Sequence, residues 1–333
     1  MKRALTIGLM LWAVAAVQAE DRVILLDRQQ RPVSRLGEVI RFDADSLKMQ
    51  TRQGREIEIP RARVVRVESE QLPEHSQADA RFGERNYKAA LSAYQKAIRR
   101  EERNWLKREI LAQIIRCHNN LGNRRAAGSM FLILYKEDQR TLHFDAIPLV
   151  WRPWQPDREA TTEATKWLDD PQPVAKLMAA SWLLSTSKRS AAIRVLEGLK
   201  RSRDSRVQQL ANAQLWRTQL VTTRKDIVLH EWPRALQQMP FELRGGPHFV
   251  LARALAKHGA SDRSILEFMR VSIAYSAMYD LSAESLWQAG RQLEEAGNRP
   301  AAARIYREII RDYPDTSSAT QAQQRVMTLT TAG

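Results

Sequence analysis

The chain has 333 residues, of which 44% are hydrophobic, with one cysteine and a formal net charge of +15. This length exceeds that of one small domain and predicts two units or a repeat array with sizeable cores. The single cysteine excludes an internal disulfide, and Cys117 is expected to be a buried small hydrophobe instead of a reactive thiol.

Residues 1–19 have the pattern of a secretory signal peptide. Lys2 and Arg3 precede an apolar run, and the small residues Val17 and Ala19 stand at −3 and −1 of the predicted cleavage site. The run is shorter than the roughly 20 apolar residues of a membrane-spanning helix. No cysteine follows the cut, which disfavours a lipoprotein. We therefore expect a soluble mature protein that is periplasmic or secreted.

Cleavage would remove two basic residues and leave a net charge of +13. In a cytosolic protein this charge would suggest nucleic acid as a partner, but export argues against it, and we expect no nucleic acid. Outside the cytoplasm the anions are lipid head groups, wall polymers, acidic proteins and polysaccharides. A basic protein favours their encounter through long-range attraction.

Residues 20–70 are predicted to form a small β domain. Five short segments rich in β-branched residues lie close together, namely RVILLD, EVIRF, SLKMQT, REIEI and RVVRVE. Leu47 and Met49 alternate with polar neighbours, which is the period of a half-buried strand. Gly54 fits a hairpin turn with positive φ. We expect an SH3-like barrel or curled sheet that serves in docking or as a spacer, since it contains no His or Cys.

The pattern becomes helical beyond the polar stretch Ser69–Ala80, where Pro73 marks the predicted domain boundary. Alanines, leucines and arginines recur at three- and four-residue spacing to the end of the chain, and no further cluster of strands is apparent. A helical region of about 250 residues favours a repeat stack over a single bundle.

The stretch LWQAGRQLEEAGNRPAAARIYREIIRDYPDT, residues 286–316, has the pattern of two helices suited to stacking. Gly290 allows two helices to approach closely, and Gly297 fits the turn between them in a left-handed conformation. Ala302 is small where the second helix would cross the first, and Tyr306 follows on the same apolar face. A proline ends the unit.

The same spacing recurs at five places along the chain. The sets are Ala90, Tyr94 and Ala97; Ala127, Phe131 and Leu134; Ala192, Leu196 and Leu199; Ser264, Phe268 and Val271; and Ala302, Tyr306 and Ile309, with Gly122 and Gly259 at two further turns. The pattern resembles the tetratricopeptide repeat (TPR), whose 34-residue unit is helix, turn, helix and proline. The last unit is also similar to repeats of exported bacterial envelope proteins of this class.

This resemblance implies a mostly α fold in which a TPR-like α-solenoid of helical hairpins follows the small β domain. TPR-like repeats 1 and 2 are expected over residues 71–136, degenerate helical repeats over 137–240 and C-terminal TPR-like repeats over 241–330. The family implies a scaffold that binds other proteins in a superhelical groove, without a reaction. An irregular helical array without true repeats is the alternative.

The family's concave-face positions give the candidate partner-binding residues. They are Arg116, Asn119 and Asn120 in the second repeat, Arg253 and Lys257 in the fourth recognised repeat, and Trp287, Arg291, Glu294 and Glu295 in the last. The third repeat has Leu177 and Leu184 there, which implies an apolar or filled groove. The set does not match the two-carboxylate clamp that some members use for peptide C-termini.

Two other features depart from the helical background. The segment Phe144–Asp157 carries three prolines with Trp151 and Trp154, which either plug the seam between helical layers or form an exposed aromatic lip for a partner. Basic residues cluster in 188–206 and in 99–125. These clusters are either solvated outer faces or an electropositive stripe for an acidic partner, whose binding salt would weaken.

No constellation typical of catalysis, of a cofactor or of a metal is recognisable, and the six histidines are dispersed. We therefore expect a non-enzymatic protein-interaction scaffold in the cell envelope, with protein partners and no cofactor or metal. Two alternatives remain: an electrostatic binder of an anionic envelope polymer or membrane surface, and a cell-wall enzyme with an unrecognised site.

Overall fold

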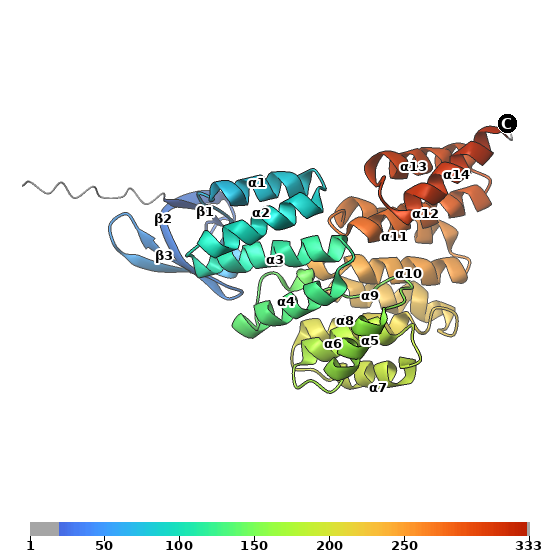
Figure 1. Cartoon of the computed structure of the whole chain (residues 1–333), viewed down its shortest axis with the longest axis horizontal. Helices are drawn as coiled ribbons and strands as arrows, with labels where there is room; N and C mark the ends of the chain where they lie inside the picture. The colour runs from blue at the N-terminus through green and yellow to red at the C-terminus, as the bar shows by residue number, and fades with distance from the viewer. Residues whose placement is uncertain (1–19, 332–333) are drawn as a thin grey trace, which may run out of the picture.

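A computed structural model describes residues 20–331, so the predicted signal peptide lies outside the described residues. Within this part the chain forms a five-stranded antiparallel sheet followed by fourteen α-helices (Figure 1). The prediction of a mostly helical chain with a small N-terminal β domain is therefore confirmed. None of the helices in residues 20–331 combines the length and apolar character that a bilayer span requires.

The sheet has the strand order β4-β3-β2-β1-β5. Its strands are β1 (Asp21–Leu26), β2 (Pro32–Phe42), β3 (Ser46–Thr51), β4 (Glu56–Pro60) and β5 (Val64–Glu68), with the 3₁₀ turn η1 (Arg61–Arg63) before β5. Strand β2 begins earlier than the sequence suggested, because its polar first half pairs with β1. Gly54 has φ 75° in the β3–β4 turn, as predicted.

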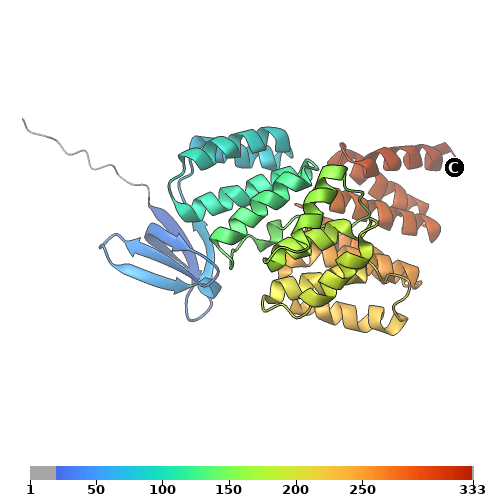
Figure 2. The ribbon, with the colours of Figure 1, turned by 60° about the horizontal axis from the view of Figure 1, so that its bottom comes forward.

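One face of the sheet packs on the first helices. Val23, Val39 and Met49 share an apolar core with residues of the first three helices, including Trp105. The Trp105 Nε1–H donates to the Val39 carbonyl oxygen at 3.1 Å. The sheet is therefore fixed to the helical region by a common core, and Figure 2 shows it at one end of the molecule.

Each of the first four helices packs on the next one in the sequence. They are α1 (Pro73–Gly83), α2 (Tyr87–Arg100), α3 (Asn104–Asn120) and α4 (Arg124–Glu137). Asn86 caps α2 by accepting a hydrogen bond from the Ala89 N–H at 3.2 Å. Cys117 lies buried in α3, as predicted, and burial raises the pKa of its thiol to about 12. The thiol is therefore protonated and unreactive at neutral pH.

The remaining helices form two further groups. The first is α5 (Arg158–Trp167), α6 (Pro173–Leu183), α7 (Arg189–Leu199) and α8 (Ser205–Trp216), followed by the π-helical turn η3 (Ile227–Glu231) and α9 (Trp232–Gln238). After the 3₁₀ turn η4 (Phe241–Leu243), the second is α10 (Gly245–Lys257), α11 (Ser261–Ala274), α12 (Tyr279–Glu295), α13 (Arg299–Asp312) and α14 (Ser317–Thr331). Helices α6, α8, α10 and α12 also contact one another in that order, forming a common layer.

The residues predicted at helix crossings are buried. All fifteen members of the five sets lie in the core, on α2, α4, α7, α11 and α13, each of which packs on the helix before it. Gly122, Gly259 and Gly297 have φ values of 77°, 73° and 82° in the turns between paired helices. The left-handed turns predicted at these glycines are confirmed.

Gly290 lies where α12 meets α13, and a Cβ built on it would come 2.5 Å from the Tyr306 ring. Gly290→Ala is therefore expected to lower the free energy of unfolding by about 1–3 kcal/mol through overpacking. Gly198→Ala on α7 is the matched control, because a Cβ there meets no atom within 4 Å, and it should be neutral or stabilising by up to ~1 kcal/mol. Urea unfolding measures both. Equal stability of Gly290→Ala and wild type would contradict this close contact.

The two ends of the helical region meet. Tyr87 at the start of α2 lies edge-on to Tyr279 at the start of α12, with ring centroids 5.8 Å apart. The Arg85 guanidinium lies over the Tyr279 and Tyr313 rings at 5.2 and 4.9 Å. These side chains connect the α1–α2 pair to the C-terminal helices.

Candidate binding cleft and the central segment

The segment Phe144–Asp157, here called the central segment, connects α4 to α5. It begins with the 3₁₀ turn η2 (Phe144–Ala146) and continues without regular secondary structure. The Pro148 carbonyl oxygen accepts from Trp182 Nε1–H at 2.8 Å. The Val150 carbonyl oxygen accepts from Gln214 Nε2 at 3.1 Å, and the Val150 N–H donates to Ser181 Oγ at 2.8 Å. Side chains of α6 and α8 thus satisfy the backbone of the segment as they would that of a bound peptide.

The two tryptophans of the central segment are built into the helical region. Trp151 is 6% exposed and lies against Gly246 of α10, where a Cβ would come 2.0 Å from its indole. Trp154 is half-buried, with its ring centroid 6.0 Å from that of Trp182. The Arg124 guanidinium lies 4.9 Å from the Trp154 ring centroid. Trp151 therefore offers little surface to a partner, and its contacts are those of a residue that plugs a seam.

The candidates on α3 lie beside the central segment. Arg116 is ion-paired with Asp145, with Nη2 2.8 Å from the nearer carboxylate oxygen. Asn119 and Asn120 line a cavity of about 40 Å³ together with Trp151. The buried Asn119 Oδ1 has no hydrogen-bond partner. This cavity has room for ordered water. The α3 candidates therefore contact the central segment or the small cavity beside it.

The other candidates are spread over α10 and α12. Arg253 is half-buried, and Lys257 is exposed one turn further along α10. Trp287 packs on Tyr306 with ring centroids 5.3 Å apart, and Arg291 pairs with Glu295 at 3.0 Å. The structure places Asn119, Asn120 and Trp151 around one cavity, and these α10 and α12 residues do not line it.

His143, next to the central segment, is expected to make the fold sensitive to acid. Burial, together with the nearby Arg116 guanidinium, lowers the pKa of its imidazole from 6.5 to about 4, with Asp145 opposing the shift. The unfolded chain therefore binds this proton more tightly, so the associated stability is present above about pH 6.5 and is lost as the pH falls toward 4.

His143→Gln is expected to flatten the fall in unfolding free energy between pH 6.5 and about 4 by a part of the ~3 kcal/mol that a shift of this size represents. His75 and His118, whose pKa values burial also lowers, contribute to the remaining slope together with carboxyls such as Asp204 whose pKa is held below its usual value. Denaturant titrations at several pH values measure the slope. His230→Gln at an exposed position is the control, and identical slopes for both variants would contradict the prediction.

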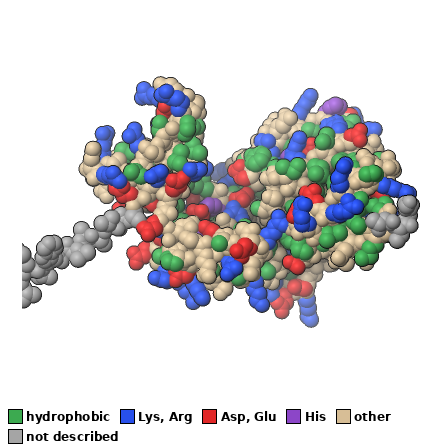
Figure 3. All heavy atoms as spheres, turned by 90° about the horizontal axis from the view of Figure 1, so that it is seen from above, with side chains coloured by type: hydrophobic (Ala, Val, Ile, Leu, Met, Phe, Trp, Pro, Cys, Tyr) green, Lys and Arg blue, Asp and Glu red, His purple; other side chains and the backbone are tan. Residues whose placement is uncertain are grey.

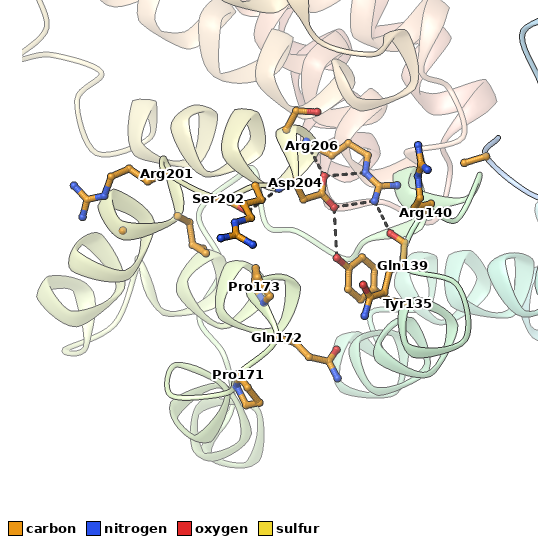
Figure 4. Close-up of a pocket in the computed structure, with 15 residues that line it drawn as sticks. Tyr135, Gln139, Arg140, Pro171, Gln172, Pro173, Arg201, Ser202, Asp204 and Arg206 are labelled. Carbon is orange, nitrogen blue, oxygen red and sulfur yellow. Dashed lines mark hydrogen bonds and ion pairs between the residues drawn. The ribbon is translucent and has the colours of Figure 1, made fainter.

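A larger cavity of about 900 Å³ opens near the C-terminal end of α4. Three connections form it: the residues after α4, the α5–α6 turn and the α7–α8 turn, with one residue from the β2–β3 turn. We call it the basic cleft. Its lining residues include Tyr135, Gln139, Arg140, Pro171, Gln172, Pro173, Arg201, Ser202, Arg203, Asp204 and Arg206 (Figure 4).

The floor of the basic cleft is a fixed polar network. Asp204 caps α8, and its carboxylate accepts from Arg206 Nη2 at 2.8 Å. Arg206 also donates to the carbonyl oxygens of Gln139 and Thr141 at 2.6 and 3.2 Å, and its guanidinium lies 4.0 Å from the Phe144 ring centroid. Burial alone would raise the pKa of the Asp204 carboxyl, but hydrogen bonds from Arg206 outweigh it and hold that pKa below its usual value.

The rim of the basic cleft carries the remaining cations. Arg140 pairs with Asp45 at 2.7 Å. Arg201 and Arg203 are exposed, and among the described residues no carboxylate lies within 4.0 Å of either guanidinium. Figure 4 places Arg201 at one end of the drawn residues and Arg140 at the other. The cleft therefore presents separated positive charges around a rigid floor, an arrangement that attracts anions.

The basic cleft has the composition of a binding site. The lining contains no histidine, so none of its serines has a histidine base beside it. Over residues 20–331 no three potential ligands among His, Cys, Asp and Glu are grouped to hold a metal ion.

The basic cluster predicted at 188–206 contains three residues of the cleft lining, Arg201, Arg203 and Arg206. The sequence did not point to Arg140 and Gln172, because only the fold brings them close to this cluster.

On the one face shown in Figure 3, basic side chains do not merge into a continuous patch. Lys and Arg are scattered there, with Asp and Glu between them.

Comparison with known proteins adds no assignment, since no protein-family model and no curated sequence matches the chain.

Proposed function

We propose that the chain is an exported, non-enzymatic interaction scaffold of the TPR class. In this proposal the helices form a TPR-like α-solenoid, and the sheet is an SH3-like module that docks on it. The observation that carries the proposal is the burial of the five residue sets at successive helix crossings, with left-handed glycines at three of the turns. A helical array of this kind offers surface for partners along its length.

The central segment changes where a partner would bind. TPR scaffolds bind partners in the groove. Here the donors on α6 and α8 that could hold a peptide backbone already donate to the carbonyl oxygens of Pro148 and Val150. Leu177 and Leu184, at the groove positions of the third repeat, are buried. The basic cleft offers an open polar surface that the central segment does not line, and we assign partner binding to it.

Capture of partners from envelope extracts tests the scaffold. The mature protein is immobilised and exposed to detergent-solubilised envelopes at low salt, and bound proteins are quantified by mass spectrometry. Recovery of one or a few proteins near a 1:1 ratio, as a scaffold requires, is the expected result. A monomeric protein that captures no protein would contradict the proposal.

The second candidate is an electrostatic binder of an anionic envelope polymer or membrane surface. The net charge of +15 for the whole chain and the unpaired Arg201 and Arg203 favour it. The face shown in Figure 3 does not match a flat anionic surface, because its basic side chains are interspersed with acidic ones. Retention on an anionic matrix that salt does not release would remove electrostatics as its basis.

A further inference from the structure

The charges in the basic cleft divide into a satisfied and an unsatisfied part. Arg206 is neutralised by Asp204 and held by two carbonyl oxygens, so its donors are committed to the fold. Arg201 and Arg203 have no carboxylate within 4.0 Å in the described part of the chain. An incoming anion therefore meets two guanidinium groups that lose no internal pair on binding.

The neutral lining favours one kind of anion. Gln139 and Gln172 contribute amides, Pro171 and Pro173 contribute apolar edges, and the buried Gln172 Oε1 has no hydrogen-bond partner. This orphaned acceptor is enclosed by the protein, so the Gln172 amide must turn toward the cleft to reach an N–H donor from a ligand, and it gains a missing hydrogen bond by doing so. A peptide backbone supplies such donors, whereas a polyphosphate or an acidic polysaccharide without amide groups does not.

The shape of the cleft excludes two other anions. A single phosphate is held best by donors that converge on one point, but Arg140 and Arg201 lie at opposite ends of the residues drawn in Figure 4. A lipid surface would need a protruding face, whereas these arginines line a cavity of about 900 Å³. None of the large exposed apolar side chains in residues 20–331 lines this cavity to enter a bilayer.

We propose that the basic cleft binds an extended acidic segment of a partner protein. Carboxylates of this segment pair with Arg201 and Arg203, and one of its backbone N–H groups donates to Gln172 Oε1 after the amide has turned toward the cleft. This inference rests on the proposed scaffold function and names the chemistry of the partner. It also gives a role to the basic cluster at 188–206, most of which lies on α7 and in the turn that borders the cleft.

The test is fluorescence anisotropy of the full mature protein with a labelled synthetic peptide of alternating Glu and Ser. Arg201→Glu/Arg203→Glu is expected to weaken binding at least about tenfold. Arg304→Glu/Arg307→Glu on α13 changes the net charge equally at exposed positions outside the cleft, and it should weaken binding less than about twofold, since distant exposed charges are screened. Gln172→Leu should weaken binding about fivefold and leave its salt dependence unchanged, because it removes a neutral acceptor.

Several results would overturn the inference. Equal weakening by the two double variants would show that only overall charge matters. Tighter binding of polyphosphate or of phosphatidylglycerol vesicles than of the peptide, lost in Arg201→Glu/Arg203→Glu, would assign the cleft to a polymer or a membrane. If Gln172→Leu bound the peptide with wild-type affinity, the proposed hydrogen bond to Gln172 would be wrong. Arg201 and Arg203 are exposed, so their substitution should leave the melting temperature unchanged. An unchanged melting temperature would show that the variant is folded.

The failure of this inference differs from a failure of the scaffold proposal. If wild type and Arg201→Glu/Arg203→Glu capture the same envelope proteins, the scaffold stands and the cleft assignment falls. If wild type captures none, the scaffold itself falls.

Discussion

Trp151→Ala is expected to lower the free energy of unfolding by about 3–5 kcal/mol, the cost typical of truncating a buried Trp. The ring fills the space between the central segment and α10, and its removal leaves a cavity against Gly246. The loss should also loosen the connection of α1–α4 to the helices beyond, because the segment is the only covalent link between them. Urea unfolding measures the free energy.

Gly246→Ala tests the same contact from the other side. A Cβ at Gly246 would meet the Trp151 indole at 2.0 Å, so this variant should also be strongly destabilised. In the Trp151→Ala background the same methyl enters the vacated space, and most of its cost should disappear. The double-mutant cycle should therefore give a coupling of about 1–3 kcal/mol. Additive costs would contradict the packing of Trp151 on α10.

Arg206→Ala is expected to destabilise the chain by about 3 kcal/mol, because it leaves Asp204 without its cationic partner. It also frees the carbonyl oxygens of Gln139 and Thr141, which hold the end of α4 near the start of α8. Arg203→Ala, in the same turn but exposed, is the control and should change stability by less than ~0.5 kcal/mol.

Thermal unfolding, together with hydrogen exchange at residues 138–144, measures the effect of Arg206→Ala. The variant should show faster exchange there, since the backbone loses its anchor. A variant as stable as Arg203→Ala would show that the floor of the basic cleft is no structural unit.

Local signals in the sequence predicted local structure well. The turn glycines at 122, 259 and 297 adopt positive φ, because few other residues tolerate that conformation at a helix end. Ala302 and Tyr306 are buried together, because helical spacing places them on one face. Alternating apolar residues such as Leu47 and Met49 marked the sheet for the corresponding reason.

Features that depend on contacts between distant segments could not be predicted from the sequence. The family's groove positions assume an uninterrupted stack, but the central segment separates α4 from α5 and lies against α6 and α8. Arg116 therefore meets Asp145 of the protein itself. The basic cleft unites residues near 140, 172 and 203, and no local pattern reports that proximity.

The structure also separates two uses of aromatic and basic residues that look alike in sequence. Trp151 and Trp154 contribute to internal contacts, and Arg206 is committed to the cleft floor. Arg201 and Arg203, only a few residues away, keep their donors exposed. In the proposed function, stability and recognition reside in neighbouring residues, so single substitutions are expected to separate them.

Hydrogen exchange of the protein, with and without a partner captured in the proposed experiment, tests the proposed scaffold and its cleft most directly. Binding in the basic cleft predicts protection concentrated in residues 139–141, 171–173 and 198–206, with the central segment unchanged. Protection confined to α12–α14, or release of the central segment on binding, would contradict the account.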